Sequence, residues 1–263
     1  MIVVGGGSGQ VGGRVARLLS VPYVLLVRDA GRAPAGVSVR VAGYADTAGM
    51  TEALRGAETF FFVSGREDQH RLAAHRSAVD AAVAAGVRRI VYLSFFGAAA
   101  DCTFTFGRDH WHTEQYIRDS GLRYTFLRDN MYLEMIPRLA GEDGVIRGPA
   151  RDGRVAAVGY DDVAAAAVAV LEDPDGHDGR TYDLTGGEAF TLAEAAEVLG
   201  LRYENETVEE AYASRARYGA SAFEVDGWVT SYTAIAAGEL AGVSGDVERL
   251  TGRVPKRLTE IDR

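Results

Sequence analysis

The chain has 263 residues, of which 47% are hydrophobic, so it can bury a sizeable core as one large domain or as a main domain with a small lobe. Its net charge of −9 and the lack of a basic run argue against a nucleic-acid partner. No apolar stretch is long enough to span a membrane, and because the first predicted strand begins at residue 2 we expect no signal peptide. Because the single cysteine, Cys102, also excludes an internal disulfide framework, we expect a cytoplasmic protein without a membrane partner.

The first thirteen residues predict a strand, a glycine-rich turn and a helix. Residues 2–4 are apolar, glycines follow, and residues 10–20 have apolar side chains at helical spacing. This order is typical of dinucleotide binding, because glycine lets a pyrophosphate approach the backbone and the helix N-terminus attracts its charge. The glycines fit two registers, one starting at Gly6 and one at Gly7, and both include Gly9 and Gly12.

The second predicted strand, residues 23–27, ends at Arg28 and Asp29. In a Rossmann unit the residue after this strand meets the adenosine ribose. An acidic residue binds the 2′-hydroxyl of NAD, whereas an arginine suits the 2′-phosphate of NADP. Because Arg28 comes first, the sequence favours NADP(H), with NAD(H) as the alternative that Asp29 leaves open.

Strands and helices alternate along the next part of the chain, with Ser64 and Gly65 directly after the fourth strand. Asp46 is the expected N-cap of one helix, and Gly86 is expected to stop another, on which His70 and His75 are interpreted as surface or helix-face residues. The alternation predicts an α/β fold, a Rossmann-type doubly wound parallel sheet with right-handed crossovers. The expected strands are 38–41, 58–63, 89–93, 123–127 and 180–184, and the expected helices are 47–55, 68–85, 108–120 and 161–171.

The pattern loosens beyond Asn130, where we expect a smaller, mostly helical C-terminal lobe. A helix is predicted over residues 192–199, and residues 206–263 are interpreted as further helical segments. The predicted domains are a Rossmann domain over residues 1–185, with residues 131–150 contributing to the substrate lobe, and a small substrate or cap lobe over residues 186–263.

Motifs occur along most of the chain, and the more specific of them are His110-x-x-Thr113-Glu114 and the stretch Ser120-Gly121-Leu122-Arg123-Tyr124-Thr125. These motifs resemble the NmrA-like, atypical short-chain dehydrogenase/reductase group, in its NAD(P)H:quinone oxidoreductase and triphenylmethane-reductase-like branch. The resemblance favours the G-x-x-G-x-x-G register that starts at Gly6. It implies an oxidoreductase that uses NADP(H) and places the cofactor on Gly6, Gly9, Gln10, Val11, Gly12, Arg28, Ser64 and Gly65.

The Tyr-x-x-x-Lys pair of the wider superfamily is missing, because the only lysine is Lys256 and no tyrosine precedes it by four residues. The resemblance puts Phe106 at the tyrosine position and His110 at the lysine position. Phenylalanine cannot transfer a proton, so ordinary ketone reduction is disfavoured. Hydride addition to a quinone gives a weakly basic phenolate that water can protonate. His110 is interpreted either as a ribose or acceptor contact or as a helix residue bonded to Glu114.

We therefore expect an NAD(P)H-dependent reductase of a small apolar, quinoid or aromatic acceptor, acting as a monomer or homodimer, without a metal. The residues expected to border the nicotinamide and acceptor are Ser94, His110 and Tyr132. Aromatic and apolar residues after the fifth and sixth strands suggest an acceptor pocket, with core packing as the alternative for each: Phe95, Phe96, Phe104, Phe106, Trp111, Met131 and Tyr132. Two other functions stay open, a non-catalytic NADP(H)-binding redox sensor of the NmrA type and a pathway-specific reductase of secondary metabolism.

Overall fold

The computed structural model describes residues 1–34 and 36–261, and it contains a central sheet of seven strands in the order β3-β2-β1-β4-β5-β6-β9. β1 pairs in parallel with both β2 and β4, so the strand order reverses at β1, as in a Rossmann fold. The strands are β1 (Ile2–Val4), β2 (Tyr23–Val27), β3 (Val39–Val41), β4 (Thr59–Val63), β5 (Arg89–Phe95), β6 (Arg123–Asp129) and β9 (Thr181–Leu184). The predicted fold class is confirmed.

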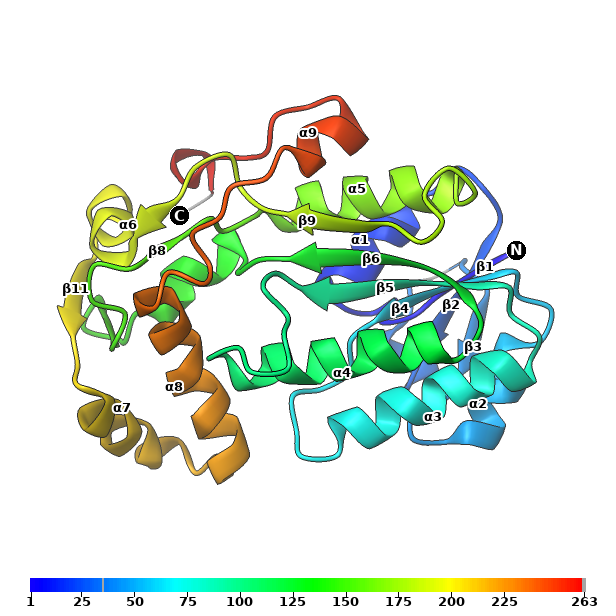
Figure 1. Ribbon diagram of the computed structural model, residues 1–263, viewed down its shortest axis with the longest axis horizontal. Coiled ribbons are helices and arrows are strands. Elements are labelled where there is room, and N and C mark those ends of the chain that lie inside the picture. The colour runs from blue at the N-terminus through cyan, green and yellow to red at the C-terminus, as the bar shows by residue number, and fades with distance from the viewer. Residues whose placement is uncertain (35, 262–263) are drawn as a thin grey trace. The chain divides into compact units, whose positions relative to one another are not determined.

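Helices cover both faces of this sheet (Figure 1). α1 and α5 lie on one side, and α2, α3 and α4 lie on the other. Aromatic side chains of the central strands, Phe60, Phe62, Tyr92 and Phe126, are fully buried in one core with apolar residues of α2, α3 and α4. These helices are α1 (Gln10–Leu18), α2 (Thr47–Leu54), α3 (Arg71–Ala84), α4 (Thr105–Asp119) and α5 (Tyr160–Glu172).

Local signals in the sequence explain most helix ends. The Asp46 carboxylate accepts the Gly49 N–H at the start of α2, as predicted, and Gly86 follows α3 with a φ of +74°. The predicted start of α3 at Asp68 is wrong by three residues, because the helix begins at Arg71. The Asp68 side chain accepts the His70 N–H, and this local turn competes with helical hydrogen bonding.

The described chain divides into two compact units, and each consists of several segments. Unit 1 comprises Met1–Ser94, Asp109–Arg128 and Val163–Tyr182. Unit 2 comprises Phe95–Arg108, Asp129–Asp162 and Asp183–Arg263. The predicted boundary at residue 185 lies close to the last passage between the units, and unit 2 also takes in two earlier segments.

Unit 2 contains short strands as well as helices. β10 (Phe190–Thr191) pairs with β8 (Arg154–Val155), and β11 (Arg202–Asn205) pairs with β7 (Val145–Gly148). None of these strands was predicted, because segments of two to four residues are too short for an alternating pattern to appear. The helices are α6 (Leu192–Leu199), as predicted, α7 (Val208–Arg215), α8 (Ala222–Ala236) and α9 (Asp246–Thr251), and the 3-10 segments include Leu133–Leu139, Ala216–Tyr218 and Leu258–Glu260.

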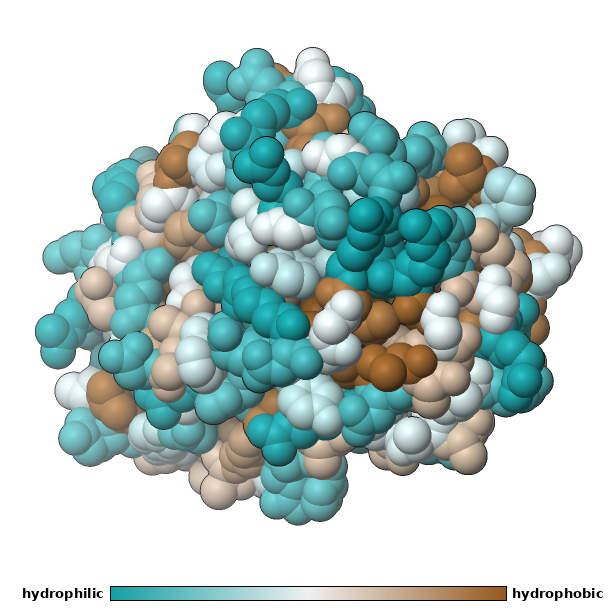
Figure 2. Space-filling model, turned by 45° about the vertical axis from the view of Figure 1, so that its right-hand side comes forward, coloured by the Kyte–Doolittle hydropathy of each residue, from teal (hydrophilic) through white to brown (hydrophobic). Residues whose placement is uncertain are grey.

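Polar residues dominate the face of the molecule drawn in Figure 2, and hydrophobic residues gather there mainly in one area. Such a surface agrees with a chain in which 25% of the residues are charged. Within residues 1–34 and 36–261, no helix combines the length and the apolar character needed to cross a membrane.

Candidate dinucleotide site

The turn after β1 needs glycine at particular positions. Gly6 has a φ of +62°, which L-residues rarely adopt, and its carbonyl accepts the Gly9 N–H at 2.8 Å. A Cβ on Gly12 would lie 2.4 Å from the Gly6 carbonyl oxygen and 2.7 Å from that of Gly5. The turn therefore folds back tightly onto the first turn of α1, and this geometry explains glycine at positions 6 and 12.

The N-terminus of α1 is suited to hold an anion. Its N-cap is Gly9, and no side chain caps the helix by a hydrogen bond. Its first N–H groups, of Gln10, Val11 and Gly12, follow directly on the glycine turn. Because such groups and the helix dipole favour negative charge, a phosphate fits this position.

Arg28 and Asp29 follow β2 and differ in what their side chains do. The Asp29 carboxylate accepts the Gly31 N–H at 2.9 Å and thereby caps the short helical turn of Ala30–Arg32. The Arg28 side chain is exposed. The carboxylate is thus bound within its own loop, and the guanidinium faces solvent.

The end of β4 lies directly beside the glycine turn. β1 and β4 are paired so that Val4 is opposite Phe61, and the Gly5 N–H donates to the Phe61 carbonyl at 2.8 Å. A Cβ on Gly6 would lie 3.1 Å from Cβ of Val63. Whatever fixes the end of β4 therefore also supports the glycine turn.

Two side chains hold this strand end, and neither was predicted to do so. The Tyr44 hydroxyl donates to the Val63 carbonyl at 2.8 Å. The Gly65 N–H donates to Nε2 of His75 at 2.8 Å. Of the two interpretations, surface or helix-face histidine, only the helix-face one holds for His75, which is fully buried, whereas His70 is exposed. A histidine on a helix carries no periodic signal that would have revealed this contact.

His110 lies in the interior of unit 1 with 5% exposure. Nη2 of Arg71 is 2.9 Å from its Nε2, and the Tyr92 hydroxyl is 3.0 Å from its Nδ1. Since a guanidinium only donates, Nε2 accepts, and Nδ1–H donates to Tyr92. Burial and the neighbouring Arg71 charge hold the pKa of His110 well below its usual range. The ring is therefore neutral, with both nitrogens engaged inside the unit.

Ser94 is also fully buried, at the end of β5. Its hydroxyl donates to Oε1 of Glu114 at 2.6 Å. The same carboxylate binds Arg128, on β6, through Nε at 2.8 Å and Nη2 at 2.6 Å. The His-x-x-Thr-Glu motif of α4 thus places two consecutive polar side chains, Thr113 and Glu114, in the interior of unit 1.

Tyr132 and Phe106 belong to unit 2. The Tyr132 hydroxyl donates to the buried Asp129 carboxylate, and its ring centroid lies 4.2 Å from that of Tyr160. Phe106 is 2% exposed, and a Cβ on Gly227 would lie 2.1 Å from its ring. Phe106, which the family resemblance puts at the tyrosine position, is therefore a packing residue.

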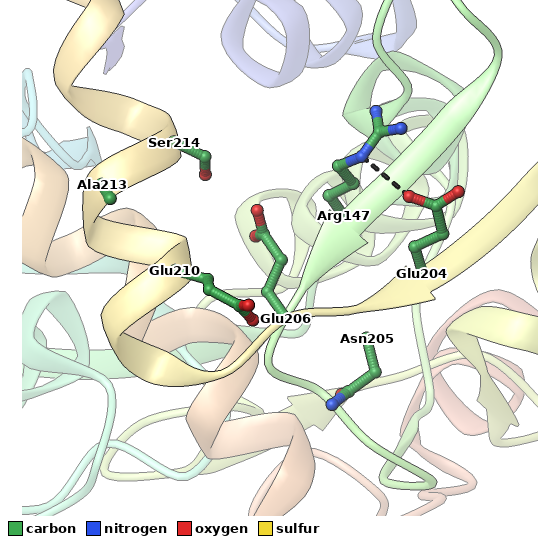
Figure 3. A pocket seen from close by; sticks show the side chains of 7 residues that line it. All are labelled: Arg147, Glu204, Asn205, Glu206, Glu210, Ala213 and Ser214. Atoms are coloured by element: carbon green, nitrogen blue, oxygen red, sulfur yellow. Dashed lines mark hydrogen bonds and ion pairs between the residues drawn. The ribbon is translucent and has the colours of Figure 1, made fainter.

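Core packing accounts for several of the aromatic residues expected to form an acceptor pocket. Phe95, Phe104 and Phe106 are buried in the core of unit 2, where Phe96 and Met131 pack against them. A pocket of unit 2, lined by β7, β11 and α7, is polar instead (Figure 3). Its walls carry more acidic than basic side chains and do not suit an anionic dinucleotide: Arg147, Glu204, Asn205, Glu206, Glu210, Ala213 and Ser214.

The parallel sheet that reverses at β1 and the open helix N-terminus after a glycine turn define a Rossmann protein with a dinucleotide site. The model of a family described as NAD(P)H-binding matches residues 6–174, and the chain belongs to this family.

Relatives with assigned activities agree with the predicted branch. The chain is 38% identical over 211 residues to quinone oxidoreductase 2 of Escherichia coli (strain K12), covering 76% of this chain and 73% of that protein. It is 31% identical to an NAD(P)H azoreductase of Xenophilus azovorans, and the match covers 99% of this chain and 96% of that protein. It is also 36% identical to a (4-alkanoyl-5-oxo-2,5-dihydrofuran-3-yl)methyl phosphate reductase of Streptomyces griseus, and this match covers 96% of this chain and 93% of that protein.

Solved structures extend this agreement to the fold. The NADPH complex of the Escherichia coli quinone oxidoreductase QOR2 has a TM-score of 0.90 at 34% identity, covering 99% of this chain and 98% of that one. Triphenylmethane reductase of Citrobacter sp., in complex with NADP(H), has a TM-score of 0.86 at 28% identity, and the match covers 98% of this chain and 97% of that one. The regulator Nmra, at 15% identity and a TM-score of 0.75, shares the fold.

Proposed function

We propose that this protein is an NAD(P)H-dependent oxidoreductase that transfers hydride to an apolar, quinoid or aromatic acceptor. The observation that carries the proposal is the tight glycine turn, shaped by Gly6 and Gly12, that leads directly into the uncapped N-terminus of α1, whose first N–H groups can bind a phosphate. The names of the relatives, which include quinone, azo and triphenylmethane reductases, support the class of acceptor.

NADPH is the proposed cofactor, and NADH is the weaker alternative. The Arg28 guanidinium is exposed at the end of β2, where a 2′-phosphate would lie. The Asp29 carboxylate is bound to the Gly31 N–H and is less available to a ribose 2′-hydroxyl. The pyrophosphate would be held by the backbone from Gly6 to Gly12, and the cofactor's middle would lie along Ser64 and Gly65.

The proposed chemistry requires little from side-chain acids. The cofactor supplies the hydride, and the protein binds and orients the two reactants. Phe106 has no proton to give, and His110 is held neutral by burial. A quinone fits these conditions because the phenolate formed after hydride addition takes its proton from water.

The residues expected to border the nicotinamide receive different proposed roles. Tyr132 is half-buried, and its hydroxyl is oriented by Asp129, so it is our candidate for contact with the acceptor. Ser94 and His110 are buried, with their polar atoms engaged by Glu114, Arg71 and Tyr92. Their direct contact with cofactor or acceptor stays a prediction, and we propose that they support the wall of the site.

One relative favours a second class of acceptor. The Streptomyces griseus reductase matches nearly the whole chain, and its name describes an oxo-dihydrofuran phosphate as its substrate. A reductase of a specialised pathway would use the same cofactor site. Only its acceptor would differ from a quinone.

The test is NADPH and NADH oxidation by the purified protein with quinones, azo and cationic dyes and an oxo-dihydrofuran phosphate, together with a cofactor titration. Consumption of NADPH with a quinone or dye supports the first proposal, and turnover of the furan compound alone supports the second. Tight NADPH binding without turnover of any compound would favour the redox-sensor alternative. Absence of cofactor binding would overturn the proposed function. The cytoplasmic location and the monomeric or dimeric state stay predictions.

A further inference from the structure

His75, on α3, is a fully buried histidine whose two ring nitrogens both have partners in unit 1. The Gly65 N–H lies 2.8 Å from Nε2, and the Thr113 hydroxyl oxygen lies 2.9 Å from Nδ1. The ring packs edge-on against Phe62, with the centroids 5.0 Å apart. The side chain thus connects α3, α4 and the turn that follows β4.

The donors and acceptors allow one arrangement of protons. The Gly65 N–H can only donate, so Nε2 of His75 accepts and carries no proton. Nδ1–H then donates to the Thr113 oxygen, and the Thr113 hydroxyl donates to the Asp109 carbonyl at 2.8 Å. The imidazole is neutral, in the Nδ1–H tautomer, and the hydroxyl fixes which nitrogen faces Gly65.

The turn held by His75 is the one that supports the glycine turn. Tyr44 holds the Val63 carbonyl, and His75 holds the amide of Gly65, two residues further along. A Cβ on residue 65 would lie 3.3 Å from Nε2 of His75 and 3.4 Å from the Tyr44 ring. Both side chains therefore pack directly against Gly65 and limit the paths that the backbone can take.

We propose that His75 is a positioning residue for the cofactor, which fixes the backbone of Ser64 and Gly65 along the path of the dinucleotide. This inference rests on the proposed function, because it assigns the turn to the cofactor's middle. The Gly65 N–H is occupied by His75, so the turn contacts the cofactor through its other groups. His75 itself does not touch the cofactor.

Two substitutions separate the two hydrogen bonds of His75. In His75→Gln the side-chain amide reaches the position of Nε2, and its oxygen can accept the Gly65 N–H. In His75→Asn the shorter amide reaches only the position of Nδ1 and can serve Thr113 but not Gly65. His75→Leu removes both bonds, and His112→Gln, at an exposed histidine of α4, is the control.

The experiment measures amide exchange of Gly65 in the cofactor-free protein, NADPH affinity by titration, and KM and kcat with a quinone. We expect protected Gly65 and unchanged affinity in H75Q and H112Q. In H75N and H75L we expect faster amide exchange at Gly65 and NADPH binding that is weaker by about tenfold. A tenfold loss of affinity corresponds to about 1.4 kcal/mol, which is the usual contribution of one buried hydrogen bond. KM for NADPH should rise by the same factor, while kcat changes less than about twofold, because the turn binds ground and transition states alike.

Equal losses in H75Q and H75N, or losses that follow only the melting temperature, would overturn the proposal and leave His75 as a core residue. Unchanged Gly65 exchange in H75L would overturn it as well. A wild-type protein that binds no NADPH would instead refute the proposed function, and the Gly65 exchange rates would still show whether His75 fixes the turn.

Discussion

The Arg128 guanidinium and the Glu114 carboxylate form a two-bond ion pair in the interior of unit 1. The Glu114 side chain has no exposed surface, and that of Arg128 is 21% exposed. Ser94 adds a third hydrogen bond to the same carboxylate. Removal of the Arg128 guanidinium would leave this buried carboxylate with the Ser94 hydroxyl and with Nη1 of Arg118, which lies 3.5 Å from Oε2.

We therefore expect Arg128→Met to lower the free energy of unfolding by about 3 kcal/mol, the usual cost of breaking a buried pair from one side. The matched control is Arg88→Met, because Arg88 pairs with Glu58 at the surface, where both side chains are more than half exposed. That change should cost less than about 1 kcal/mol. Urea unfolding at pH 7.5 checks both values, and equal losses would contradict the assignment.

Arg28 provides a test of cofactor choice. We expect Arg28→Ala to weaken NADPH binding about 10- to 100-fold, the value of a charge-assisted hydrogen bond, and to leave NADH binding nearly unchanged. Arg17→Ala, at an exposed arginine in the last turn of α1, serves as the control. Both affinities are measured by titration, and equal weakening of the two cofactors would remove Arg28 from the 2′-phosphate site.

The tight approach at Gly12 predicts a change in both binding and stability. In Gly12→Ala the new methyl group meets two backbone carbonyls at 2.4 and 2.7 Å, and neither can rotate away. We expect a stability loss of about 1–3 kcal/mol and NADPH binding at least about tenfold weaker. For comparison of stability, Gly43→Ala introduces a methyl group with no neighbouring atom within 4 Å. If urea unfolding and titration find G12A equal to wild type, the described turn is incorrect.

The buried histidines predict a dependence of stability on pH. Burial, with the nearby Arg71 charge, holds the pKa of His75 well below its usual value of 6.5. Below pH 6.5 the His75 side chain binds a proton in the unfolded chain but not in the folded chain. The contribution of the neutral, buried His75 to the free energy of unfolding is therefore complete above pH 6.5 and is lost as the pH falls. His110 behaves in the same way.

His75→Gln should therefore reduce the fall in the free energy of unfolding between pH 6.5 and 5.5 by about 1 kcal/mol. Urea unfolding at several pH values measures the slope. His112→Gln, at the exposed histidine, should keep the wild-type slope. An unchanged slope in H75Q would mean that His75 is protonated in the folded protein.

The fold was accessible from the sequence because its signals are local. Inner strands of the sheet, such as β1, β2 and β4, are nearly continuous apolar runs, and residues such as Asp46 and Gly86 mark helix ends. The short strands of unit 2 were missed because β7 pairs with β11 across more than fifty residues, and nothing within either segment indicates its partner. Pairing of that kind is decided by tertiary contacts.

The glycine turn after β1 was predictable, whereas the side chains that support it were not. Gly6, Gly9 and Gly12 are recognised by spacing. His75 and Tyr44 reach the end of β4 from other segments, and their roles depend on which way a helix face or a loop points. His110 was expected at the ligand, but its contact with Arg71 needed the position of α3 relative to α4.

The chain passes between the two units five times, the last time at residues 182 and 183. Neither unit is a continuous stretch, so a change of acceptor cannot be achieved by exchanging one terminal segment for that of a relative. A graft of residues 186–263 from a relative would pack that protein's segment against Phe95–Arg108 and Asp129–Asp162 of this chain, so the core of unit 2 would come from two different proteins. We therefore expect that engineering of this chain's specificity has to proceed through point substitutions and loop changes in place.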